Sequence, residues 1–164
     1  MLVSKYSTHE TLKQKGAKDM LALPEIEKAI KEITESFEGS FSMKTPAGKY
    51  FYVSDYWLAA LHLQRDAVIG KTDAEIFTGP QADAARETDL EAIETKHPIE
   101  YVKELVHNDI TIRYIAIKWA FILPHGMPFC ICTLADFVEH KGRVFAQKEK
   151  IDEYLHVMSL VGED

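Results

Sequence analysis

The sequence predicts an α+β fold, in which helices pack against a five-stranded antiparallel sheet. The first observation is that segments 40–44, 49–53, 99–106, 110–123 and 127–135 are rich in β-branched and aromatic residues. The second is that short turns join the strands within each of the two groups, which favours antiparallel neighbours. The third is that helical patterns separate the two groups and flank them on both sides.

Length and composition favour one domain with flanking segments. The chain has 164 residues, of which 46% are hydrophobic and 27% are charged, as is usual for globular domains. We expect an N-terminal arm and amphipathic helix at 1–38, a central domain at 39–138 and a C-terminal helix at 139–164.

Net charge, hydropathy and cysteine content indicate which partners and which cellular compartment to expect. A net charge of −7 argues against direct nucleic-acid binding by this chain, because a phosphate backbone attracts clustered lysine and arginine. No apolar run reaches the ~20 residues of a membrane span, and no signal peptide is evident, so we expect a cytoplasmic protein with no membrane contact. Cys130 and Cys132 are too close in sequence for an ordinary structural disulfide.

An amphipathic helix is predicted to begin at Pro24 and to end before Gly39. Proline suits the first helical turn, and apolar residues recur from Ile26 onwards at helical spacing. This apolar face can cover the domain's own sheet, or it can also pair with a second copy of the chain. The sequence permits both interpretations.

The region between the strand groups is predicted to contain short helices and one long helix. Ser54 and Asp55 end the second strand and favour a helix cap, and Gly70 ends the short helical segment that follows. Residues 81–96 form the long helix, whose charged residues, Asp89 among them, are predicted to face water. The apolar face predicted for this helix consists of Ala82, Ala85, Leu90 and Ile93.

Three successive segments, 53–57, 61–66 and 68–71, carry a resemblance to a known family. They are similar to the strand and short helices in the first half of a PAS domain. Residues 136–140 stand where PAS domains commonly carry a DITERK-like ending, and the first, acidic position matches. The resemblance covers about residues 40–140 and implies the PAS order of strands and helices.

The resemblance implies a sensory module and no catalytic activity. Such a domain binds a small molecule or a partner and passes the change to an output, here expected to be a helix-turn-helix or kinase domain outside this chain. The expected host is a bacterial transcription regulator or sensor kinase that works as a homodimer. The alternatives are a ligand-free interaction module and a small enzyme with a cavity.

The C-terminal helix has the spacing of a short coiled coil at Val144, Ile151, Leu155 and Met158.

The resemblance also bears on cofactors. Flavin-binding members carry a reactive cysteine where this sequence has Asp73, so no flavin adduct is expected. Haem-binding members place a histidine on the long helix, whereas His97 lies just beyond it beside Pro98 and suits a turn. No nucleophile elbow, phosphate-binding loop or metal-binding histidine pair occurs in the sequence, so no catalytic or metal-binding residue is predicted, and the ligand stays unknown.

Strand parity predicts which face of the sheet lines the pocket. Alternate residues of a strand share a face, and the usual PAS register turns the face of Tyr114 and Lys118 toward the helices. On the neighbouring strand it is expected to turn Cys130, Cys132 and Leu134 the same way. Lys118 needs a counter-charge there. Its ammonium either extends to the sheet edge or pairs with Asp73 or Glu75, or it binds a small acidic or amphipathic molecule. The predicted ligand-binding residues are Tyr52, Tyr56, Asp73, Phe77, Tyr114, Ala116, Lys118, Cys130, Cys132 and Leu134.

The opposite face of the same strands is strongly apolar and must be covered. The N-terminal amphipathic helix is the candidate, alone or together with the same helix of a partner subunit. The predicted dimer-interface residues are Ile26, Ile30, Ile33, Phe37, Ile115, Ile117, Trp119 and Phe129.

Overall fold

The computed structural model describes residues 24–162, and their side chains as far as residue 156. The N-terminal arm predicted before Pro24 and the coiled-coil position Met158 fall outside this description. In chain order the elements are α2 (Pro24–Ser36), β1 (Ser40–Lys44), β2 (Tyr50–Val53), α3 (Asp55–Leu61), η1 (Arg65–Ala67), α4 (Asp73–Ile76), α5 (Pro80–Thr95), β3 (Ile99–His107), β4 (Ile110–Ile122), β5 (Pro128–Phe137), η2 (Val138–His140) and α6 (Lys141–Gly162).

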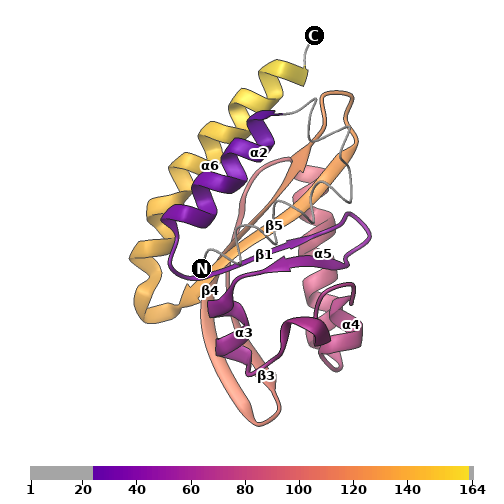
Figure 1. The fold of residues 1–164 in the computed structure, drawn as a ribbon, viewed down its shortest axis with the longest axis vertical. Coiled ribbons are helices and arrows are strands. Elements are labelled where there is room, and N and C mark those ends of the chain that lie inside the picture. Colours follow the sequence, from indigo (N-terminus) through magenta and orange to yellow (C-terminus); the bar gives the residue numbers. More distant parts are fainter. Residues whose placement is uncertain (1–23, 163–164) are drawn as a thin grey trace.

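The strands form one sheet in the order β2-β1-β5-β4-β3, and each neighbouring pair is antiparallel. This confirms the predicted five-stranded sheet. The first hairpin, β1 and β2, lies beside β5, so the last strand of the chain is the central one. Helices α2 and α6 run side by side along one face, whereas α3, α4 and α5 lie on the other side of the sheet (Figure 1).

Local signals explain where the elements on the second side begin. The Ser54 hydroxyl accepts from the backbone N–H of Trp57 at 3.2 Å, which caps α3, and it also accepts from the N–H of Phe41 at 3.0 Å. Thr72 and Glu75 form a capping box at α4. Because Ser54 bonds to both β1 and α3, it ties the start of the helical wall to the sheet.

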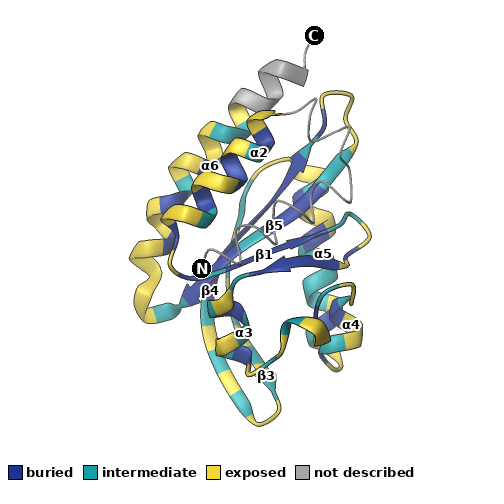
Figure 2. Cartoon of the chain, in the orientation of Figure 1, coloured by how far each residue is buried: buried dark blue, intermediate teal, exposed yellow. Residues whose placement is uncertain are grey.

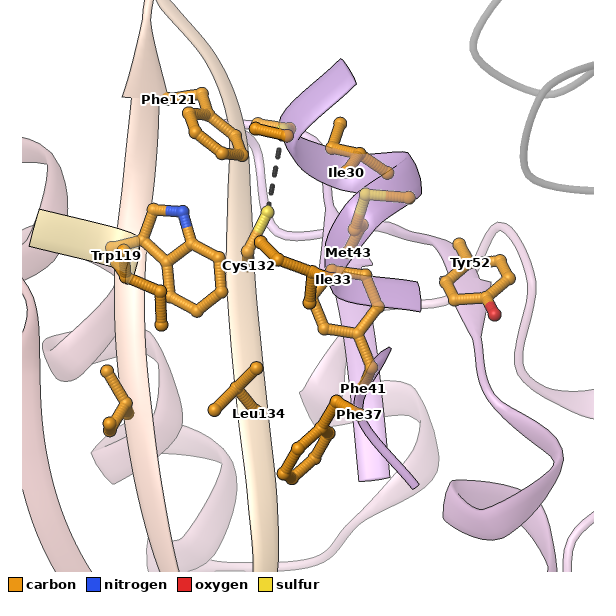
Figure 3. Close-up of a cluster of buried hydrophobic side chains, with 14 of the residues drawn as sticks. Ile30, Ile33, Phe37, Phe41, Met43, Tyr52, Trp119, Phe121, Cys132 and Leu134 are labelled. Atoms are coloured by element: carbon orange, nitrogen blue, oxygen red, sulfur yellow. Dashed lines mark hydrogen bonds between the residues drawn. The ribbon is translucent and has the colours of Figure 1, made fainter. Parts of the chain in front are cut away.

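The face of the sheet under α2 and α6 holds the larger apolar core. Ile26, Ile30 and Ile33 of α2 are 1–2% exposed, and they pack with Trp119 and Leu134 of the sheet (Figure 3). Val144 and Ile151 of α6 complete the cover, whereas the sequence pattern pointed to the N-terminal helix, alone or with its copy from a partner subunit. Each buried isoleucine contributes ~1.5–3 kcal/mol relative to an exposed one.

The residues predicted as a dimer interface belong to this core. Seven of them are buried within the chain, and Phe129 is partly buried against the same cluster. The prediction that they form an interface is therefore wrong for the chain as folded, because its own helices already cover them. The seven are Ile26, Ile30, Ile33, Phe37, Ile115, Ile117 and Trp119.

The predicted parity of β5 is wrong as well. Trp119 lies opposite Cys132 and Lys118 opposite Thr133, and directly opposed residues of antiparallel strands share a face. Even positions on β4 therefore share a face with odd positions on β5. Cys130, Cys132 and Leu134 consequently lie in the core under α2 and α6, where the two sulfur atoms are 3.8 Å apart (Figure 3).

Tyr52 also belongs to that core. It pairs with Met43, and its ring centroid is 5.8 Å from that of Phe41. A register shift between Met43 and Lys44 then places Lys44 opposite Tyr50. Tyr50, and not Tyr52, therefore lies on the pocket side of the sheet.

Burial differs along the sheet (Figure 2). Strands β1, β2 and most of β4 and β5 are buried, whereas the edge strand β3 alternates between partly buried and exposed residues. The partly buried residues of β3 include Tyr101, Lys103 and Leu105, which belong to the wall of a cavity. The edge strand thus contributes to the site with one face only.

Candidate functional site

A cavity of about 370 Å³ lies between the sheet and helices α3, α4 and α5. This size is within the range of pockets that hold small molecules. The wall is mainly apolar and aromatic, with polar side chains at a few places. Its aromatic residues are Tyr50, Tyr56, Trp57, Phe77, Tyr101, Tyr114 and Phe137.

The cavity brings together half of the residues predicted to bind a ligand. Tyr56, Asp73, Phe77, Tyr114 and Lys118 line it. Ala116 is fully buried on the strand face that Tyr114 and Lys118 share, but it does not line the cavity. The other predicted residues, Tyr52, Cys130, Cys132 and Leu134, are in the core on the opposite face.

Four charged side chains, Lys44, Asp73, Asp89 and Lys118, form a buried network beside the cavity. The Nζ atom of Lys44 lies 2.7 Å from Oδ2 of Asp73 and 2.7 Å from Oδ2 of Asp89. The Nζ atom of Lys118 lies 2.7 Å from Oδ1 of Asp89. All four side chains are at most 7% exposed, and their formal charges cancel, as burial requires.

Lys118 already has partners for its whole ammonium group. It donates to Asp89 at 2.7 Å, to the Thr88 hydroxyl at 2.7 Å and to the Ala85 carbonyl at 3.2 Å. An ammonium group has three N–H donors, so none is left for a ligand. The pairing predicted with Asp73 or Glu75 is wrong, because Asp89 is the counter-charge, and an acidic ligand has no donor to bind at Lys118.

Asp89 and Lys44 were not predicted as site residues. Asp89 was expected on the water-facing side of the long helix, yet it is 0% exposed, and Leu90, expected on the apolar face, is 50% exposed. The buried residues of α5 are Ala82, Asp89 and Ala92. The i, i+7, i+10 spacing of small residues with one aspartate was the signal for a face that packs closely and carries one charge.

Buried tyrosines add hydroxyl groups to the wall. The Tyr50 hydroxyl donates to Oδ1 of Asp73 at 2.6 Å, so both carboxylate oxygens of Asp73 are engaged. Burial, and then the charge of Asp73, hold the pKa of Tyr50 well above its ordinary value. Burial also raises the pKa of Tyr101 and Tyr114. These hydroxyls therefore stay protonated at neutral pH, and the proton of Tyr50 is already donated to Asp73.

Asp136 connects the cavity to the start of the C-terminal helix. It is 2% exposed and lines the cavity, and its Oδ1 accepts from the Tyr56 hydroxyl at 3.1 Å. Its Oδ2 lies 2.8 Å from Nη2 of Arg143 on α6, and Nδ1 of His140 lies 3.1 Å from Oδ1. Burial, and then the charge of Asp136, raise the pKa of Tyr56 to about 12. One carboxylate thus contacts both the pocket and α6.

Within residues 24–162, none of the helices has the length and apolar character that a bilayer span requires. In the same part of the chain, no three acidic, histidine or cysteine side chains are grouped as a metal site would need.

Comparisons with known proteins identify the fold. No protein-family model matches the chain, and no curated protein sequence does. Among solved structures, the PAS domain of Bordetella pertussis BvgS is 14% identical, with a TM-score of 0.54 over 70% of this chain and 88% of that one. This chain has the PAS fold. The resemblance predicted from residues 53–71 is confirmed at the level of the fold.

Two further structures with the PAS fold come from Vibrio cholerae. A sensory box sensor histidine kinase is 13% identical, with a TM-score of 0.53 over 71% of this chain and 94% of that one. VqmA, described as a dimer and a LuxR-type receptor, is 20% identical, with a TM-score of 0.53 over 65% of this chain and 50% of that one. The PAS fold of this chain places the cavity and the buried network between its helical wall and the sheet.

Proposed function

We propose that this chain is a sensory PAS domain that binds a small molecule in its cavity and passes the change through α6 to an output. The observation that carries the proposal is the cavity of about 370 Å³ with an aromatic wall. Cavities of this size and lining are the usual binding sites for small molecules. The proposal assigns no catalytic role to any residue.

The relay in this proposal uses the Asp136 junction. A ligand that contacts Tyr56 competes with or reorients its hydrogen bond to Asp136, 3.1 Å long. Asp136 also holds Arg143 at 2.8 Å, so its position affects the first turn of α6. The output, by analogy with the sensor histidine kinase and the LuxR-type receptor, is a kinase or DNA-binding domain.

Native mass spectrometry of the purified chain tests ligand binding directly. We expect a retained non-protein mass in the wild type and its loss in Ala84→Leu, because Ala84 lines the cavity and three added carbons reduce its volume. The control is Ala146→Leu, at an exposed position of α6, which should retain the mass. Equal occupancy in Ala84→Leu and the wild type would place the ligand elsewhere.

A homodimeric interaction module is the second candidate function. It is favoured by exposed apolar side chains on neighbouring elements, Phe145 of α6 at 43% and Val102 of β3 at 53%. An ion pair of 2.9 Å between Lys148 and Glu100 joins these two elements. Light scattering after gel filtration should give a dimer mass that Phe145→Ser lowers and Lys141→Ser leaves unchanged. A monomeric wild type would exclude this function.

A further inference from the structure

The three lysines of the cavity wall differ in whether their ammonium groups are already paired with a carboxylate. Lys44 and Lys118 are 2–3% exposed and are neutralised by Asp73 and Asp89. Lys103, on β3, is only partly buried. Among the described residues, its ammonium has no ion pair, and it lies over the ring of Tyr101, 5.2 Å from the centroid.

The charges around Lys103 have both signs: Lys118 disfavours its charged form, whereas Glu87, Asp73 and Asp89 favour it. The ammonium of Lys118 lies 5.7 Å from the centroid of the same Tyr101 ring. Burial, and then the positive charge of Lys118, lower the pKa of Lys103. A negative group placed directly beside Lys103 would favour its charged form further, since an opposite charge within a few ångströms stabilises it.

Several hydrogen-bonding groups left in the cavity wall are donors, and the carboxylate of Glu104 is an acceptor in the same wall. Both carboxylate oxygens of Asp73 are occupied by Tyr50 and Lys44. Lys44 has two carboxylate partners and therefore one N–H to spare. The hydroxyl of Tyr114 makes no hydrogen bond to the described part of the chain, and its ring meets that of Tyr101 edge-on at 6.4 Å. A ligand that suits this wall offers acceptors.

We propose that the cavity selects small aromatic monoanions, with the anionic group on Lys103 and the ring against the aromatic wall. The proposal rests on the proposed function, since it names the ligand class of the same cavity. It moves the anchor for an acidic ligand from Lys118, where every donor is used, to Lys103. The apolar wall of Trp57, Phe77, Tyr101 and Tyr114 accounts for the ring.

The test uses three probes of one shape and different charge: 2-naphthoate, its uncharged amide and 2-naphthylmethylammonium. Binding to the whole chain is followed by NMR through the indole N–H of Trp57, which lines the cavity. Trp119, fully buried in the core on the opposite face, is the internal reference, and Trp57→Phe assigns the two signals. We expect 2-naphthoate to bind about fivefold more tightly than the amide, the size of a partly exposed ion pair.

Variants at Lys103 decide whether this lysine causes the preference. Lys103→Gln should bring the ratio of the two dissociation constants close to one, Lys103→Arg should keep it, and the exposed control Lys141→Gln should leave it unchanged. A preference for the amide, or one that survives Lys103→Gln, would overturn the inference and leave the sensory function standing. If no probe moves the Trp57 signal and no mass is retained in native spectra, both proposals are wrong.

Discussion

Asp89 of α5 and Lys118 of β4 form an ion pair of 2.7 Å in which neither side chain is more than 3% exposed. The second oxygen of Asp89 lies 2.7 Å from Lys44, so one carboxylate neutralises parts of two buried cations. The pair joins the long helix to the longest strand across the cavity wall. Breaking this ion pair should therefore lower the stability of the fold and change the shape of the pocket.

Removing the charge of Asp89 should destabilise the fold strongly. Asp89→Asn leaves two buried ammonium groups with only Asp73 to compensate them, and breaking a buried pair on one side costs about 3–5 kcal/mol. Urea denaturation should record this loss in the free energy of unfolding. The exposed Glu91→Gln on the same helix should change it by less than about 0.5 kcal/mol. A small effect at Asp89 would mean that water reaches the network.

The protein should lose stability at alkaline pH, and Tyr50 should contribute to the loss. The pKa of Tyr50 in the folded chain is well above the ordinary value of 10.0, so the unfolded chain releases this proton first. The stabilisation is complete below pH 10 and decreases as the pH rises toward the folded pKa, by about 1.4 kcal/mol per pH unit for one proton.

Urea denaturation between pH 8 and 11 should show this decline, and Tyr50→Phe should make it less steep. At pH 8 the same variant should be less stable by about 1–2 kcal/mol, because Asp73 loses a donor. An unchanged alkaline slope in Tyr50→Phe would show that the hydroxyl is not protected from ionisation by the fold.

Cys130 and Cys132 should be unreactive in the native protein. Both are 0% exposed in the core under α2 and α6, and burial, then the hydrogen bond with Cys130, raise the pKa of the Cys132 thiol. Because the thiolate is the reactive form, Ellman's reagent should label them only as fast as the core opens.

The labelling rate also distinguishes the two faces of the sheet. It should rise with urea in parallel with loss of the core. Rapid labelling in buffer would return the cysteines to the pocket face that their sequence parity first indicated.

The sequence was sufficient for the strands and for the amphipathic helix α2, because both depend on local periodicity. It was insufficient for the faces of β5 and β2, since a face depends on register, and a shift of one residue exchanges the two faces. Two such features depend on the assembled sheet and cannot be read from local sequence: the register shift between Met43 and Lys44, and the pairing of Lys118 with Thr133.

The buried network was out of reach for a related reason. Lys44, Asp73, Asp89 and Lys118 come from four different elements, and each looks like an ordinary surface residue by itself. Asp73 and Lys118 were found because a resemblance placed them in a pocket. Their partners Lys44 and Asp89 become visible only when the elements are assembled.

The Asp136 junction should control the order of the first turns of α6. Arg143→Gln removes the contact of 2.8 Å to a carboxylate that is 0% exposed, so the beginning of α6 should open more readily. Hydrogen exchange should become about fivefold faster for amides near Arg143, and Lys141→Gln should have no such effect. Tyr56→Phe, which removes the bond from the cavity side, should raise exchange in the same turns. If Tyr56→Phe changes exchange only around α3, the cavity and α6 are not coupled through Asp136, and the relay must take another route.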